Sequence, residues 1–258
     1  MGDVTDALLR WYDEQGRDLP WRRTRDPYAV LVSEVMLQQT QVARVIPRYE
    51  AWLERWPDAA ALAAASPADV LREWVGLGYN RRALRLRDAC VAVARDGWPV
   101  TASGLRALPG VGPYTAAAVA SFAFDEQVAA VDDNVARVST RLGTEPATLV
   151  PEGRAASFNH AMMDLGATIC TARRARCEAC PVARLCPSEG AAAAPVTRSG
   201  ARQRFEDTDR FARGRIVAAL AAGEALPGGL GEERTERALA GLARDGLVVR
   251  DGDAVRLP

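Results

Sequence analysis

The sequence predicts an all-α protein with a small appended module at its C-terminus. Apolar residues recur at helical spacing through most of residues 1–187, and no segment there shows sustained strand periodicity. Proline and glycine breaks separate these helical patterns. Residues 188–208 are rich in Ala, Gly, Ser, Arg and Pro, and this composition predicts a linker before a separate C-terminal module.

The first helical pattern places Val4, Leu8, Trp11 and Tyr12 on one face, and Pro20 follows its end. The remaining helices are expected from about residue 27, at 43–55, 59–64 and 67–75, from the break at 76–79 to about 95, on both sides of the turn at 109–113, and from about 132 onward.

The C-terminal residues 209–258 read as two helices, at about 210–222 and 232–245, followed by two short runs around Asp251 and Gly252. Such runs on either side of an Asp-Gly pair predict a β-hairpin. Two helices and a hairpin outline a small winged-helix-like module. An unspecialised α/β appendage is the alternative.

Composition excludes several classes of protein. The 258 residues are 48% hydrophobic and 26% charged, as in ordinary soluble domains. We expect no membrane insertion and a cytoplasmic location, because the N-terminus lacks a basic signal and no apolar run is long enough to span a bilayer. The 33 basic residues balance 33 acidic ones, and all of the basic residues are arginines. Without lysine, no side-chain amine can form a Schiff base.

Four of the five cysteines fall close together with the spacing C-x6-C-x2-C-x5-C. They are Cys170, Cys177, Cys180 and Cys186. A cluster of thiols in a chain without a secretory signal indicates metal rather than disulfides. Zinc sites commonly use C-x2-C pairs, whereas the longer flanking gaps suit an iron–sulfur cluster, so both stay open on spacing alone. Cys90 reads as a small buried apolar residue.

The segment from Leu108 to Ala116 has the form of two helices joined by a tight turn. Gly110 and Gly112 let the backbone turn, and the amides that begin the next helix can then point at a phosphate oxygen. Contacts of this kind hold DNA without reading its sequence. Such a turn alone is weak evidence, because many helical proteins use one for packing.

Six segments in order resemble the helix–hairpin–helix DNA glycosylases, and within them the MutY-type adenine glycosylases. They begin at Leu19, Ser33, Gly76, Leu108, Val131 and Phe158, and the last continues into the cysteines. The resemblance implies two helical lobes, a six-helix lobe at about 26–129 and a cluster lobe at about 1–25 plus 130–187. It implies that Cys170, Cys177, Cys180 and Cys186 bind a [4Fe–4S] cluster. It also implies a monomer whose partner is double-stranded DNA with a mismatched or damaged base pair.

Two carboxyl groups resemble the catalytic pair of this family. Breaking an N-glycosidic bond requires an acid to protonate the leaving base and a carboxylate to stabilise the cationic sugar. Glu34 resembles the general acid and Asp132 the stabilising carboxylate. The alternatives are a solvated helix glutamate for Glu34 and a helix N-cap for Asp132. The family commonly has glycine where Asp133 stands.

Tyr114 occupies the position at which endonuclease III-like relatives place a Schiff-base lysine. The resemblance therefore implies a monofunctional glycosylase that leaves an abasic site. Asn134 is expected to orient Asp132.

Further residues match positions that line the base pocket or contact DNA: Trp21, Arg22, Leu37 and Gln39. For Trp21 and Leu37, core packing is the competing interpretation. Gln38 and Tyr79 match residues that wedge into the duplex when a base is flipped. His160 departs from the Gln or Glu that the family has there, and Asn80 departs from a tyrosine.

The resemblance favours removal of adenine opposite 8-oxoguanine or guanine. A thymine or uracil glycosylase acting on G mismatches is the nearest alternative, because that sister group shares the Glu, Tyr, Asp and cysteine pattern. A non-catalytic iron–sulfur DNA-binding regulator is the third. Residues 209–258 are too short for the Nudix-like domain that MutY-type enzymes commonly add to recognise 8-oxoguanine.

Overall fold

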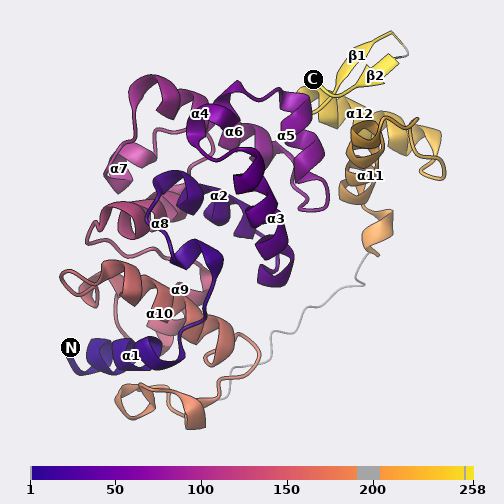
Figure 1. Ribbon diagram of the computed structural model, residues 1–258. Coiled ribbons are helices and arrows are strands. Elements are labelled where there is room, and N and C mark those ends of the chain that lie inside the picture. Colours follow the sequence, from indigo (N-terminus) through magenta and orange to yellow (C-terminus); the bar gives the residue numbers. More distant parts are fainter. Residues whose placement is uncertain (1, 191–203, 253) are drawn as a thin grey trace. The chain divides into compact units, whose positions relative to one another are not determined.

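The computed structural model describes residues 2–190, 204–252 and 254–258. Helices dominate this part of the chain, and its one sheet is a two-stranded hairpin (Figure 1). The contacts group into two units. The first comprises residues 1–34 and 98–198, and the second comprises 35–97 and 199–258. None of the described helices has the length and apolar composition that a bilayer span requires.

The first unit is a stack of helices around one apolar core. Its helices are α1 (Gly2–Gln15), the start of α2 (Pro27–Leu37), α7 (Ala102–Leu105), α8 (Pro113–Phe124), α9 (Asp133–Leu142) and α10 (Ala155–Thr168). The first unit also contains short 3₁₀ turns: η1 (Pro20–Arg22), η2 (Pro146–Thr148), η3 (Cys177–Ala179) and η4 (Ala183–Leu185). Helix α10 packs against α1, α8 and α9. Fully buried Phe158 and Met162 of α10 meet Leu8 of α1 and Val135 of α9 in this core.

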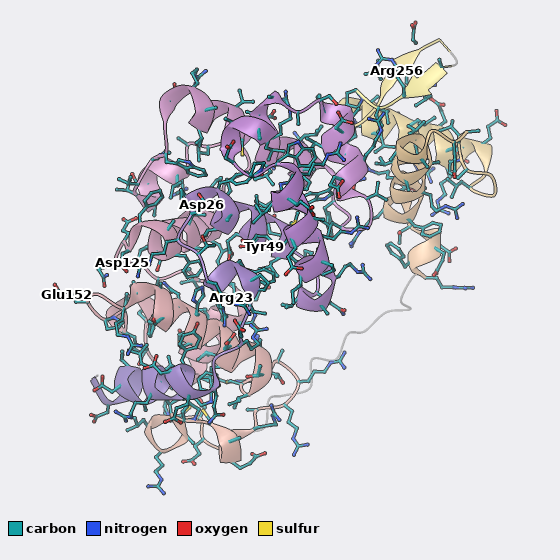
Figure 2. All side chains as sticks on the ribbon, in the orientation of Figure 1. Arg23, Asp26, Tyr49, Asp125, Glu152 and Arg256 are labelled. Carbon is teal, nitrogen blue, oxygen red and sulfur yellow. The ribbon has the colours of Figure 1, made fainter. Side chains whose placement is uncertain are left out.

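The second unit contains the remaining helices and the hairpin. They are the end of α2, α3 (Val42–Arg55), α4 (Ala59–Ala64), α5 (Pro67–Trp74), α6 (Arg81–Asp96), η5 (Phe205–Asp207), α11 (Asp209–Ala222), α12 (Glu232–Arg244), β1 (Val249–Asp251) and β2 (Ala254–Arg256). Helix α6 packs on α4 and α5, and α11 packs on α12 and α5. Trp52 and Trp74 are fully buried, and their rings meet edge to face at 5.4 Å. Tyr49, labelled in Figure 2, is buried on the same helix as Trp52.

Local sequence signals explain where several helices begin. Asp58, Ser66, Thr101, Asp132 and Thr208 each cap a helix by accepting a hydrogen bond from a backbone N–H of the first turn. The predicted helices are therefore confirmed, as is the hairpin, in which Val249 pairs with Arg256. The expected domain boundaries and the winged-helix identity of residues 209–258 stay predictions. Part of the expected linker, residues 191–203, lies outside the described residues.

Helix α10 approaches the first turn of α9 so closely that it requires a glycine. A Cβ built on Gly166 would lie 2.7 Å from Cβ of Asn134 and 3.2 Å from its backbone. Any side chain at this position would push the two helices apart, and Asn134 would move with them.

We therefore expect Gly166→Ala to lower the free energy of unfolding by about 1–3 kcal/mol, the usual cost of overpacking. The matched control is Gly214→Ala in α11, where a Cβ would meet nothing within 4 Å. There alanine should stabilise the helix by about 0.5–1 kcal/mol. Thermal and denaturant unfolding measure both effects, and equal melting temperatures for the two variants would contradict the close approach.

Candidate active site

Glu34 lies near the end of a helix that is buried on every side. Helix α2 begins where Asp26 accepts hydrogen bonds from the backbone N–H groups of Tyr28 and Ala29 (Figure 2). Its residues from Tyr28 to Met36 are all buried, so Glu34 has an apolar surrounding and is only 4% exposed. Its Oε2 atom has no hydrogen-bond partner among the described residues. A solvated surface glutamate is thereby ruled out.

The environment of Glu34 moves its titration into the neutral pH range. Its pKa is raised to about 7, mainly by burial and also by the nearby charge of Asp132, while a hydrogen bond with Tyr114 and the charge of Arg22 oppose the rise. A carboxyl group with this pKa can hold a proton at physiological pH and release it to a bound base. Burial and the neighbouring Glu34 in turn raise the pKa of Tyr114 well above its ordinary value, so its hydroxyl stays protonated.

Asp132 has a polar surrounding instead. It is the N-cap of α9: its Oδ1 accepts from the backbone N–H of Val135 at 2.7 Å, and its Oδ2 accepts from Nδ2 of Asn134 at 3.0 Å. Both bonds hold the carboxylate group in place at the start of the helix. The N-cap alternative is therefore correct for Asp132, and it is compatible with the expected role because capping holds the charge in place.

The Asn134 amide is held in turn by residues that the sequence patterns did not single out. Its Oδ1 accepts from Nη2 of Arg137 at 2.7 Å, and the same Nη2 donates to the backbone oxygen of Gly166 at 2.7 Å. The amide of Asn134 therefore points its NH₂ group at Asp132. The spacing of Arg137 three residues after Asn134 on one helix was the available signal.

Arg22 is held by a buried carboxylate rather than exposed to solvent. Both of its terminal nitrogens donate to Asp164 at 2.8 Å, and Arg17 donates to the same carboxylate through Nε at 2.7 Å. Burial alone would raise the pKa of Asp164, but the two arginines outweigh it and hold the pKa low. Trp21, next to Arg22, is buried at 6% exposure, in keeping with core packing for its ring.

His160 stands on α10 between two aromatic rings. Its ring centroid lies 4.1 Å from that of Phe122 and 6.2 Å from that of Tyr12. Its pKa is lowered to about 3, mainly by burial and also by the charges of Arg22 and Arg17, which the charge of Asp164 opposes. The imidazole is therefore neutral at physiological pH and does not supply protons there.

The expected turn before α8 is present and exposed. Gly110 takes a left-handed conformation with φ 76°, and Gly112 is the N-cap of α8. Pro113 begins the helix, so the exposed turn leads directly to Tyr114 in the first turn of α8. This is the geometry expected of a phosphate-binding hairpin.

Four residues expected at the DNA interface belong to the second unit: Leu37 and Gln39 as base-pocket or DNA contacts, and Gln38 and Tyr79 as wedge residues. Leu37 and Gln38 are half-buried, Gln39 is exposed, and Tyr79 is 45% exposed. Gln39 and Tyr79 have φ values of 58° and 47°, a left-handed conformation that is uncommon for residues other than glycine.

Arg82 joins the two loops that carry these residues. Its Nη1 donates to the backbone oxygens of Val35 and Gln38, and its Nη2 donates to those of Leu77 and Gly78 at 3.1 and 3.0 Å. None of the sequence patterns pointed to Arg82. An arginine shortly after a Gly-x-Gly break was the available signal.

The four cysteines lie near the core of the first unit. Cys170, Cys180 and Cys186 pack against its buried residues. The charge of the other three cysteines contributes, after burial, to raising the pKa of Cys180 to about 11, so the four sulfurs lie within electrostatic range of one another. Nη1 of Arg141 donates to Sγ of Cys170 at 3.1 Å. Within the described ranges, no group of His, Cys, Asp and Glu side chains is arranged to hold a single metal ion.

The raised pKa of Glu34 should make the free energy of unfolding depend on pH. A carboxyl group whose pKa rises on folding stabilises the native state fully below its unfolded pKa, and this contribution is lost as pH rises to its folded pKa. We expect Glu34→Gln to become more stable relative to the wild type by about 2–3 kcal/mol between pH 4.5 and 7 and to keep that advantage above pH 7.

The measured quantity is the difference in free energy of unfolding between the variant and the wild type. Both proteins contain His160, whose lowered pKa reduces stability below pH 6.5, and this effect cancels in the difference. Denaturant unfolding at several pH values supplies it. A difference in stability that does not vary with pH would show that Glu34 is solvated.

Known proteins resemble this chain over most of its length. Residues 32–156 match the model of the HhH-GPD superfamily base excision DNA repair proteins. The adenine DNA glycosylase of Mycolicibacterium smegmatis is 46% identical over 83% of this chain and 78% of its own length. That of Mycobacterium tuberculosis is 41% identical over 95% of this chain and 90% of its own.

The solved structure of a thermostable thymine-DNA glycosylase is 30% identical, with a TM-score of 0.67 over 71% of this chain and 94% of that one. The similarity confirms the predicted helix–hairpin–helix glycosylase fold. The two mycobacterial relatives exceed it in identity and in coverage of this chain. The chain therefore belongs to the adenine DNA glycosylase family of the HhH-GPD superfamily.

Proposed function

We propose that this protein is a monofunctional DNA glycosylase that hydrolyses the N-glycosidic bond of adenine paired with 8-oxoguanine or guanine. The observation that carries the proposal is the buried Glu34 carboxyl, which has a pKa of about 7 and lies within electrostatic range of Asp132. Glycosidic cleavage requires two carboxyl groups in different environments, and here Glu34 is buried among apolar side chains while Asp132 accepts two hydrogen bonds at the start of a helix.

The residues divide the reaction between them. Glu34 donates its proton to a ring nitrogen of the adenine, and the electrons of the breaking glycosidic bond pass to the base. The sugar is left with oxocarbenium character, which the Asp132 carboxylate stabilises across a short distance. Water then adds to the sugar carbon and loses a proton to the Glu34 carboxylate, which restores the starting state. Neutral adenine and an abasic sugar are the products.

Tyr114 limits the chemistry to hydrolysis. Its hydroxyl hydrogen-bonds Glu34, stays protonated, and lies 3.9 Å from Sδ of Met163, so it orients the acid and is not a nucleophile. The chain contains no lysine that could attack the sugar and open it by elimination. The abasic product should therefore stay attached to an intact DNA strand.

The four cysteines fit a [4Fe–4S] cluster better than zinc. Zinc draws four thiolates into one compact tetrahedron, whereas a cubane cluster holds them farther apart. The single C-x2-C pair is flanked by gaps of six and five residues, which suit the wider spacing of a cluster. We propose that Cys170, Cys177, Cys180 and Cys186 hold the cluster, which when bound would order this segment by cross-linking it. The cluster stays a prediction, and so do the double-stranded DNA partner, the monomeric state and the cytoplasmic location.

We expect the purified protein to release adenine from duplexes with A opposite 8-oxoguanine or A opposite G, and to leave T or U opposite G intact. Denaturing gels before and after hot alkali measure both claims. Strand breaks should need the alkali, because the abasic strand is not cut by the protein. Release of T or U alone would favour the thymine-glycosylase alternative, and breaks before alkali would contradict monofunctional chemistry.

We expect Asp132→Asn to lower the single-turnover rate of adenine release by about 100- to 1000-fold, the usual cost of removing one electrostatic stabiliser. Asparagine caps helices as well as aspartate does, so the fold should persist. Asp133→Asn is the matched control: Asp133 is adjacent and exposed, and its variant should stay within a few-fold of the wild type. A non-catalytic regulator would release no adenine, either as the wild type or as the Asp132→Asn variant.

A further inference from the structure

A groove of about 900 Å³ lies within the second unit, between the appended module and the loops beside α6. One wall is formed by residues 39–44, residues 75–82 and the start of α6, and the other by η5, α11 and residues 242–247. Helix α11 packs on α5, which precedes the first wall directly (Figure 1). The module is therefore placed against the loop that carries Tyr79.

Two contacts join the walls. The guanidinium of Arg210 lies 4.0 Å from the ring centroid of Tyr79, and its Nη1 donates to the Tyr79 hydroxyl at 2.8 Å. Asp245, at the end of α12, pairs with Arg81 at 3.5 Å and with Arg213. The wedge residue expected from the family resemblance is thus held by a residue of the appended module.

The charge of the groove is strongly positive. Asp245 is the single carboxylate among its lining residues, and its charge is already matched by Arg81 and Arg213. Seven arginines line the groove: Arg44, Arg81, Arg82, Arg85, Arg210, Arg213 and Arg215. In the described part of the chain, Arg44, Arg85 and Arg215 form no ion pair, and all three are exposed.

Arginines without carboxylate partners, spread along two walls, suit an extended polyanion. The planar guanidinium binds a phosphate through two parallel hydrogen bonds, and a nucleic-acid strand presents one phosphate per residue along its length. The whole chain has no net charge, so this attraction is local to the groove.

We propose that α11 and the loop before α6 form one binding groove for the phosphate backbone of duplex DNA, with Arg44, Arg85 and Arg215 as its contacts. The inference rests on the proposed function for its choice of polyanion. It makes the appended module part of the DNA-binding surface, and it makes Arg210 a positioning residue for Tyr79.

The test measures binding of a fluorescein-labelled duplex without a mismatch, as a function of salt, to the wild type and to Arg44→Ala/Arg85→Ala/Arg215→Ala. Each lost phosphate contact should make the slope of log K against log salt shallower by about 0.9. Melting temperatures should change little, because the three side chains are exposed and the substitution removes only the cation–π contact of Arg215 with Phe211 at 5.9 Å. An unchanged slope in the folded triple variant overturns the proposal.

Arg215→Ala and Arg244→Ala form a matched pair within the module. Arg244 is exposed on α12 and does not line the groove, so its variant should bind as the wild type does. Equal losses in the two variants overturn the proposal, since they would show diffuse attraction by any surface arginine. Wild-type binding without adenine release would instead contradict the proposed function and leave the groove in place.

Discussion

The candidate active site depends on the exclusion of water from one carboxyl group. Ionised carboxylates are several kcal/mol less favourable in an apolar surrounding than in water, so a buried carboxyl group keeps its proton instead. Helix α2 supplies that surrounding because nearly all of its residues are apolar and buried on every side. A helix with one polar face would hydrate Glu34 and return it to the behaviour of an ordinary surface acid. The apolar composition of α2 is therefore a requirement of the chemistry as well as of the core.

The second carboxyl group has polar surroundings instead of apolar ones. Asp132 receives two hydrogen bonds at the start of a helix, and its neighbour Asn134 is fixed by Arg137. Gly166 allows α10 to approach this turn without displacing it. Two carboxyl groups thus have different surroundings, one apolar and the other hydrogen-bonded. The packing of α9 against α10 is what maintains the difference.

Local signals in the sequence predicted the helices well, because caps, prolines and glycines act over a few residues. The pairing of Glu34 with Tyr114 and Asp132 came from resemblance to a family, since nothing local indicates which residues meet. Contacts between residues far apart in the sequence could not be predicted from it. Arg82 reaches oxygens more than 40 residues earlier, and Arg210 meets Tyr79 across 131 positions. Hydrophobic periodicity shows which face of a single helix is buried. It does not show which separate loops a side chain such as that of Arg82 connects.

The left-handed backbones of Gln39 and Tyr79 have a consequence for the evolution of this protein. Such conformations cost about 1–3 kcal/mol for residues with a side chain, and glycine would relieve most of that cost. Selection for a more stable fold would accordingly favour glycine at both positions. Selection for DNA repair would keep the amide and the aromatic ring. The two pressures oppose each other at these loops, so the most stable version of this chain and the most active version should be different sequences.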